Sequence, residues 1–237
     1  MKNKNIIRNL KNEEVEGQIL SVEETEEILL PQTTDTLNMV AQYRQIMCFY
    51  QSGIDQLTVK LQILSNEFQV GYDRNPIKDV TSRVKSPESI LEKMKRKNLP
   101  YTMSCMMNNI YDVAGIRVIC PLISDVYYVA RMLSNQADID VMEIKDYITS
   151  PKKNGYRSLH MIVMVDVYFS DQKRSVPVEI QIRTLAMDFW ASTEHQIRYK
   201  KEREFTEEME NELKICADLM SDADIRMQKL ASSLGIS

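Results

Sequence analysis

The sequence predicts an α+β fold, a mixed β-sheet flanked by helices, with a long helix at each end of the chain. Apolar residues recur at alternating spacings of three and four from about Asp35 to Phe68, which predicts one long helix. The same spacing returns from Leu213 to Leu234. Between these two helices, short runs rich in β-branched residues alternate with polar residues, which is typical of strands.

The elements between the long helices can be placed in order. Ser86 and Pro87 predict the start of a second helix running to about Lys97, because Ser is a favourable N-cap and Pro suits the first helical position. Strands are predicted at 113–122, 139–145, 159–168 and 176–183, with a hairpin turn at 170–173. Further helices are predicted at 125–136 and 184–199.

Composition divides the chain into three predicted regions. Residues 1–34 include a Glu-rich stretch without a base, which indicates a polar tail or a loosely docked helix. Residues 35–200 form the predicted core domain. Residues 201–237 form a helical segment whose apolar stripe is too narrow for a deeply buried helix, so we predict that it serves oligomerisation.

Several functional classes are disfavoured by composition. The 237 residues carry 30 Lys+Arg against 34 Asp+Glu, and a net charge of −4 argues against a general nucleic-acid coat. Two His and four Cys without metal-ligand spacing indicate no zinc site. No apolar run approaches the ~18 residues that cross a bilayer, and no signal peptide is evident, so we expect a cytoplasmic protein that binds no membrane.

The glycines exclude two ways of binding nucleotides. All six stand alone, so neither a dinucleotide-binding nor a P-loop motif can occur. Nucleotide phosphates would have to be met by Lys and Arg side chains or by a metal ion.

The stretch from Val176 to Arg183 is the most informative strand. Its period of two places Val178, Ile180 and Ile182 on one face and Glu179, Gln181 and Arg183 on the other. This pattern also describes an ordinary strand with a solvated polar face.

Two further charged residues favour a binding site. Asp112 stands at the start of the first predicted strand, and Arg117 interrupts its apolar run. A guanidinium in a central strand needs a partner, because burying it unpaired is very costly. That partner is either a ligand or an acid such as Glu179 on a neighbouring strand. Asp112 and Glu179 together could hold one Mg²⁺ at a sheet edge, the metal being a hard cation that prefers oxygen ligands.

Basic residues gather in two segments. On the helix after Ser86, Ser89, Lys93 and Arg96 fall on one face. The second segment, 151–160, is an Asn-Gly turn that displays several bases and aromatic residues and leads to His160. Either segment alone could be a solvated surface. Combined with two carboxylates, they predict nucleotide phosphoryl chemistry, in which bases neutralise phosphates and planar groups stack on a nucleobase.

Four ordered blocks resemble the synthetase domain of the RelA/SpoT family. They are TSRVKSPESILEKMKRK at 81–97, DVAGIRVIC at 112–120, KDYITSPKKNGYRSLH at 145–160 and VEIQIRTLAMDFWASTEH at 178–195. The likeness spans roughly residues 40–225, and over this length the chain resembles the small alarmone synthetases. Neither His160 nor His195 is followed by the Asp of the hydrolase metal site of long relatives, so synthesis alone is expected.

The resemblance implies a nucleotidyltransferase-like sheet and a defined reaction. The β,γ-pyrophosphate of ATP would pass to the 3′-hydroxyl of GDP or GTP with Mg²⁺ present, giving AMP and the alarmone (p)ppGpp of the stringent response. Small members are often homotetramers joined through terminal helices, so a homotetramer is expected. A regulatory nucleotide or RNA is a further partner that the resemblance leaves open.

The resemblance also implies residue roles. Asp112 and Glu179 would hold the metal, and Glu179 would alternatively activate the 3′-hydroxyl. The ATP-binding set would be Arg83, Lys85, Ser89, Lys93, Arg96 and Arg117, with Arg83 and Arg117 on either side of the adenine. The set binding GDP or GTP would be Lys152, Tyr156, His160, Gln181 and Asp188, with Tyr156 stacked on guanine. Asp188 stands where some small synthetases carry an Asn, which leaves the preference among GMP, GDP and GTP open.

Two other functions are compatible with the same residues. A metal-dependent nuclease would also use an Asp and a Glu on strands, although the acidic net charge disfavours DNA as a partner. A nucleotide- or RNA-binding regulator would keep the pocket without turnover, which would be expected of a chain that had lost one carboxylate.

Overall fold

The computed structural model describes residues 34–199 and 205–236. The chain separates into two compact units, residues 1–40 and 41–237. The predicted tail falls almost entirely outside the described residues, and the fold below is that of the second unit. Among the described residues, no helix is both long and apolar enough to span a bilayer.

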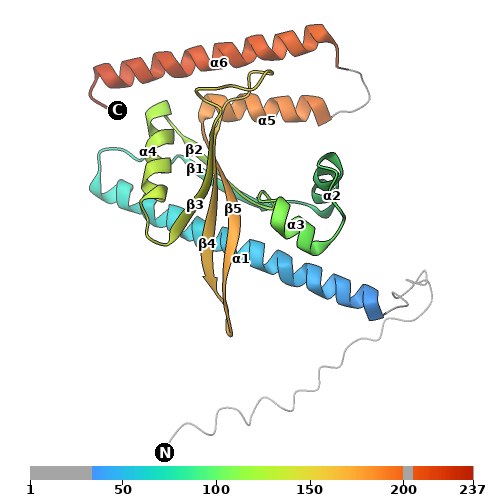
Figure 1. The fold of residues 1–237 in the computed structure, drawn as a ribbon. Helices are drawn as coiled ribbons and strands as arrows, with labels where there is room; N and C mark the ends of the chain where they lie inside the picture. The colour runs from blue at the N-terminus through green and yellow to red at the C-terminus, as the bar shows by residue number, and fades with distance from the viewer. Residues whose placement is uncertain (1–33, 200–204, 237) are drawn as a thin grey trace, which may run out of the picture. The chain divides into compact units, whose positions relative to one another are not determined.

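One mixed sheet of five strands lies at the centre of this unit (Figure 1). Its spatial order is β1-β2-β5-β4-β3. The central pair β2/β5 is parallel, and the other three neighbouring pairs are antiparallel. The strands are β1 Asp79–Val84, β2 Ala114–Cys120, β3 Ile139–Asp146, β4 Leu159–Tyr168 and β5 Lys173–Thr184. The predicted α+β class with a mixed sheet is therefore confirmed.

Six helices accompany the sheet in the described part of the chain. They are α1 Thr34–Gly71, α2 Pro87–Arg96, α3 Met103–Asn109, α4 Ile123–Ser134, α5 Leu185–Tyr199 and α6 Glu207–Ser233. The long helices expected near both ends are α1 and α6. Ser86 is the N-cap of α2, as predicted, and its hydroxyl accepts a hydrogen bond from the Ser89 amide.

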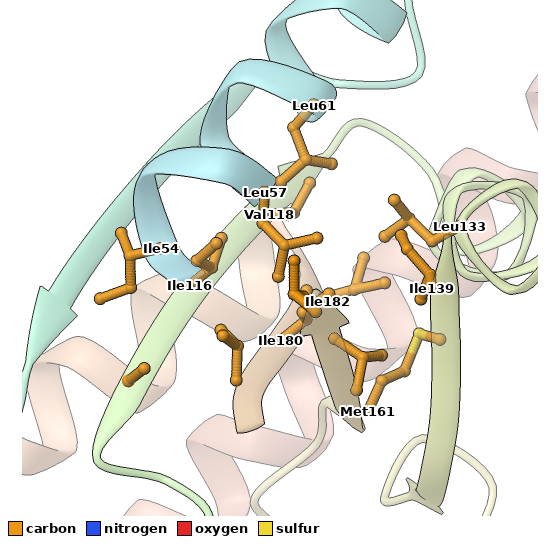
Figure 2. Packing of buried hydrophobic residues seen from close by; sticks show 14 of the residues in the cluster. Ile54, Leu57, Leu61, Ile116, Val118, Leu133, Ile139, Met161, Ile180 and Ile182 are labelled. Carbon is orange, nitrogen blue, oxygen red and sulfur yellow. The ribbon is translucent and has the colours of Figure 1, made fainter. Parts of the chain in front are cut away.

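One face of the sheet is buried under α1 and α4. Figure 2 shows Ile54, Leu57 and Leu61 of α1 over the apolar side chains of β2 and β5, with Leu133 of α4 beside them. The spacing of three and four in α1 therefore supplies the core-facing stripe. The opposite face of β5 carries the polar residues of the alternating strand.

Gly53 allows α1 to lie close to the sheet. A Cβ added to Gly53 would lie 2.9 Å from Cγ1 of Val176 on β5. A side chain here would push the helix away from the strand, so the cost of a glycine inside a helix is offset by close packing.

Two elements were not predicted from the sequence. β1 is an edge strand in which only Val80 and Val84 are half-buried and the other residues are exposed, so its apolar period is weak. α3 has seven residues and one buried side chain, Met106. Both lie in the stretch between the first long helix and the strand that begins at Ala114.

The C-terminal helix packs through a different face from its predicted seam. α6 buries Ala217, Asp224 and Ala231. Most residues of the predicted seam are exposed instead: Cys216, Ala223, Met227, Leu230 and Leu234. α6 thus has an inner face of small residues and an outer apolar stripe.

Candidate active site

The polar face of the sheet contains a cavity of about 340 Å³, which we call the sheet cavity. It is lined by side chains from β1, β2, β5 and the segments that follow β1 and precede β2. Its charged and polar lining includes Arg83, Lys85, Asp112, Arg117, Glu179 and Gln181. The period of two brings Glu179 and Gln181 to this face, because Ile180 and Ile182 occupy the buried one.

Asp112 lies in a turn before β2 and binds two ammonium groups. Its Oδ2 accepts hydrogen bonds from Lys85 Nζ, just after β1, and from Lys93 Nζ on α2, each at 2.5 Å. Burial acts to raise the pKa of the Asp112 carboxyl, but these two lysines outweigh it and hold the pKa below its ordinary value. Oδ1 is buried and has no hydrogen-bond partner among the described residues.

Glu179 is the second carboxylate of the sheet cavity. Its Oε1 lies 3.2 Å from His160 Nδ1 on β4, and its Oε2 accepts from Gln181 Nε2 at 2.7 Å. Burial acts to raise the pKa of Glu179, yet the bonds from His160 and Gln181 keep it below its ordinary value. The negative charge of Asp112 also acts to raise this pKa, which indicates that the two carboxylates influence each other.

Arg117 pairs with a helix residue and not with a strand acid. Its Nη1 lies 3.1 Å from Oδ1 of Asp188 on α5, so the predicted alternative of a pair with Glu179 is wrong. Asp188 follows β5 by one helical turn and reaches back over the parallel β2/β5 pair. Burial lowers the pKa of the Arg117 guanidinium, and the charges of Arg183 and Arg83 add to this effect.

Arg83 and Arg117 are near neighbours on one face of the sheet. In the β1/β2 register, Thr81 lies opposite Arg117 and Arg83 lies opposite Gly115. Residues 81 and 83 share a face, so Arg83 is the diagonal neighbour of Arg117. Gly115 has no side chain to fill the space between them.

The basic turn at 151–160 forms a second group, the loop cluster, made of Lys152, Tyr156 and His160 with Tyr147. Lys152 Nζ lies 4.7 Å from the ring centroid of Tyr147 and 4.6 Å from that of Tyr156. Tyr156 Oη lies 2.7 Å from His160 Nε2. Burial lowers the pKa of Lys152 and raises the pKa of Tyr156. Through His160, the loop cluster meets Glu179 of the sheet cavity.

The loop cluster is braced by α6. Arg157 donates from Nη1 to the carbonyl oxygen of Ala217 at 3.2 Å and from Nη2 to Asp218 Oδ1 at 3.2 Å. Gly155 is buried against the same helix with φ +88°. From the sequence alone, residues 151–160 could equally be an exposed hairpin turn. In the structure this segment packs against α6, which is distant in the sequence.

Two predicted residues lie apart from the others. Ser89 and Arg96 are exposed on α2 and are absent from the lining of the sheet cavity, whereas Lys93 of the same helix reaches Asp112. The alternation of β5 places Arg183 on the polar face of the strand, but the sequence predicts no function for it. It is buried, and it donates to Tyr156, Gln181 and Asp188. The signal available in the sequence was its position in the same alternating face as Glu179.

The donors available for a metal ion are two carboxylates. Within the described residues no group of three or more His, Cys, Asp and Glu side chains is arranged to hold one. The unpartnered Oδ1 of Asp112, with ionised Glu179 in the lining of the same cavity, fits a Mg²⁺ that takes one or two protein carboxylates and completes its shell with water and phosphate oxygens.

Comparison with known proteins identifies the fold and the family. Residues 82–204 match the region found in RelA/SpoT proteins. The GTP pyrophosphokinases YwaC and YjbM of Bacillus subtilis are 40% and 35% identical to the chain, over 81% and 80% of it and over 92% and 88% of their own lengths.

Solved structures agree with this assignment. Small alarmone synthetase 1 of Bacillus subtilis, bound to its product pppGpp, superimposes with a TM-score of 0.76 at 34% identity, covering 81% of this chain and 97% of that one. Small alarmone synthetase 2 of the same organism gives 0.71 at 41% identity, covering 78% and 97%. With two carboxylates and several basic side chains lining one cavity, and with this likeness over most of its length, the chain belongs to the RelA/SpoT family and is of the small alarmone synthetase type.

Proposed function

We propose that the chain synthesises (p)ppGpp by transferring the β,γ-pyrophosphate of ATP to the 3′-hydroxyl of GDP or GTP, with release of AMP. Relatives that share most of its length are GTP pyrophosphokinases. Related structures contain pppGpp in one case and AMPCPP in another. The observation that carries the proposal is the sheet cavity, whose lining combines Asp112 and Glu179 with Lys85 and two arginines, while Lys93 pairs with Asp112 from α2.

The donor nucleotide is assigned to the side of the sheet cavity formed by β1 and β2, and to the neighbouring helix α2, whose Lys93 reaches Asp112. Arg83 and Arg117 are placed to hold the adenine between their planes, with Gly115 leaving space. Lys85 and Lys93 neutralise the phosphates in place of the glycine-rich loop that the chain lacks. Arg96, which is exposed on α2, would join these two lysines at the outer phosphate of ATP. Ser89, also on α2, would lie at the edge of the ATP site.

The acceptor is assigned to the loop cluster and the neighbouring end of β5. Tyr156 stacks on guanine, while Lys152 and His160 steady the acceptor phosphates and ribose. Gln181 shapes the site, and the carboxylate of Asp188 accepts from the guanine N1–H and amino group. Glu179, kept ionised by its two hydrogen bonds, takes the proton of the 3′-hydroxyl. Positioning and charge neutralisation then suffice for in-line transfer without a covalent intermediate.

Mg²⁺ is the proposed cofactor, and Asp112 and Glu179 are the residues that would hold it. When bound, it would neutralise charge on the transferred phosphoryl groups. The fit rests on the unpartnered, buried Oδ1 of Asp112, whose other oxygen is already taken by two lysines.

The outer stripe of α6 supports assembly into a homo-oligomer, and we propose a tetramer. Leu219 and Leu230 are each 60% exposed and Leu234 is 72% exposed. A row of large apolar side chains of this kind marks an interaction surface. The division into a tail, a core and a C-terminal oligomerisation segment, a cytoplasmic location, and regulation by a nucleotide or RNA remain predictions.

The test is an incubation of the full chain with ATP, Mg²⁺ and GDP or GTP in separate reactions, with products identified by mass. A guanosine 3′-diphosphate and an equal amount of AMP are expected. Glu179→Gln should abolish both, whereas the matched control Glu67→Gln, an exposed residue of α1, should leave both intact. Folded protein that yields neither product would refute the proposal.

The same incubation separates the two alternative functions. A nuclease would cleave added DNA in a Mg²⁺-dependent way and form no new guanine nucleotide. A binding protein without turnover would retain ATP and GDP equally in the native chain and in Glu179→Gln. The presence of both carboxylates disfavours the second alternative, and the acidic net charge disfavours the first.

A further inference from the structure

Five side chains next to the sheet cavity form a closed ring of hydrogen bonds. Arg183 Nη2 donates to Tyr156 Oη at 2.7 Å and to Gln181 Oε1 at 2.6 Å. Tyr156 Oη lies 2.7 Å from His160 Nε2, and His160 Nδ1 lies 3.2 Å from Glu179 Oε1. Gln181 Nε2 closes the ring by donating to Glu179 Oε2 at 2.7 Å.

The chemistry of its two poles gives this ring a single direction. A guanidinium can only donate hydrogen bonds, and a carboxylate can only accept them. Gln181 must therefore turn its carbonyl oxygen to Arg183 and its amide nitrogen to Glu179. On the other side, His160 Nδ1 faces the carboxylate, so a neutral imidazole must carry its proton on Nδ1 and point it to Glu179. Its Nε2 then accepts from the hydroxyl of Tyr156, which itself accepts from Arg183.

The result is two parallel arms that run from Arg183 to Glu179. One passes through Tyr156 and His160, and the other passes through Gln181. Every donor in both arms points toward the carboxylate, so the hydrogen bonds polarise one another in the same sense. With a neutral imidazole, reversing any member would place two donors or two acceptors face to face.

Arg183 is committed to this arrangement by its burial. It is 4% exposed, and an uncompensated guanidinium at that depth would be very costly. Its other two nitrogens also have partners: Nη1 lies 3.2 Å from Asp188 Oδ1, and Nε donates to Ser158 Oγ at 3.3 Å. Three of its four side-chain partners are residues assigned to the acceptor nucleotide.

We propose that Arg183 is the positioning residue of the acceptor site: it orients Tyr156, Gln181 and Asp188 for guanine and directs both hydrogen-bonded arms onto Glu179. The assignment of the acceptor rests on the proposed function, whereas the direction of the arms rests on the contacts alone. Arg183 acts through these side chains and is not itself required to touch the nucleotide.

The first test is a kinetic comparison of Arg183→Met with Arg183→Lys. Losing the charged hydrogen bonds should raise KM for GDP by about tenfold to a hundredfold, and KM for ATP should stay within about twofold. Lysine keeps a buried charge and several donors, so Arg183→Lys should recover part of the loss. Equal increases in both KM values, or no increase for GDP, would overturn the proposal.

A matched control separates positioning from stability. Arg74 forms a two-pronged ion pair with the buried Asp125, outside the sheet cavity. Arg74→Met should lower Tm and leave both KM values unchanged. If it reproduces the pattern of Arg183→Met, the effect is structural and the proposal fails. If Arg183→Met does not fold, Arg183→Lys in the presence and absence of Tyr156→Phe measures the same coupling, and additive effects would refute it.

The second test reads the direction of the arms in the unaltered protein. The chain has only two histidines, so His195→Gln assigns their signals in a ¹⁵N NMR spectrum of histidine-labelled protein. In its neutral form, His160 should carry its proton on Nδ1. A proton on Nε2 would refute the direction of the arms. This measurement needs no turnover, so it stands or falls independently of the pyrophosphokinase activity.

Discussion

Gly155 provides a sharp test of how the loop cluster is built. Its φ of +88° is strained for any residue with a side chain, and an added Cβ would lie 2.5 Å from Cβ of Ala217 on α6. The backbone conformation costs about 1–2 kcal/mol in Gly155→Ala. The overlap costs about 1–3 kcal/mol more, as for an overpacked core. The free energy of unfolding should therefore fall by about 2–5 kcal/mol, which lowers Tm by roughly 4–20 °C in a chain of this size.

A second substitution isolates the steric part of this effect. Ala217→Gly removes the overlapping methyl group and by itself costs about 1 kcal/mol, because glycine is unfavourable inside a helix. In the Gly155→Ala background the same change should restore stability, giving a coupling energy of about 1–3 kcal/mol between the two sites.

The single tryptophan supplies the assay. Trp190 donates from Nε1 to the carbonyl oxygen of Leu213 at 2.8 Å and packs in the same small cluster as Ala217. Its fluorescence during unfolding, at one fixed protein concentration, reports the α5–α6 contact. Two additive substitutions, or a Gly155→Ala variant as stable as the native chain, would refute the close packing of the turn against α6.

Three further predictions concern charge and metal. Lys93→Met removes one of the two ammonium groups on Asp112, so KM for ATP should rise about tenfold in initial-rate measurements with KM for GDP unchanged; equal changes would contradict the assignment. Burial raises the pKa of Asp224 in the folded protein above its ordinary value. The free energy of unfolding therefore falls as the pH rises from the ordinary pKa through the raised pKa of the folded state. Asp224→Asn keeps an acceptor for Thr184 and should raise Tm at pH 7 by about 2–4 °C, the equivalent of about 1 kcal/mol, with the two proteins melting alike in strong acid; an unchanged melting profile would contradict a buried charge there. Chelation of divalent cations should stop product formation and added Mg²⁺ should restore it, so turnover that survives chelation would exclude the proposed metal site.

The fold was predictable where the apolar periods were long. The stripe of α1 and the alternation of β5 each extend over enough residues to show their period. β1 and α3 were missed because an exposed edge strand and a helix of seven residues bury too few side chains to show one. The inner face of α6 could not be predicted, because its buried residues, such as Ala217, are small and one of them is an aspartate, Asp224.

The residues of the candidate site also differ in how well the sequence predicts them. Asp112, Arg117 and Glu179 drew attention because charge interrupts or begins a buried strand, and that signal is local. The pairing of Arg117 with Asp188 depends on how α5 turns back over the sheet, which no local pattern contains. The role of Arg183 is visible only when the four side chains around it are known. Individual nucleotide contacts came from the family resemblance and stay predictions.

The strand order has a consequence for biogenesis. Among the described strands β5 is synthesised last, yet it occupies the middle of the sheet, between β2 and β4. A nascent chain that ends before residue 173 therefore holds two separate strand pairs, each with an unpaired edge, and Asp112 has no second carboxylate beside it. Such long-range pairing folds slowly and leaves open edges prone to association. Catalytic competence thus arrives only when β5 joins the sheet, and a chain truncated before β5 should be both inactive and aggregation-prone.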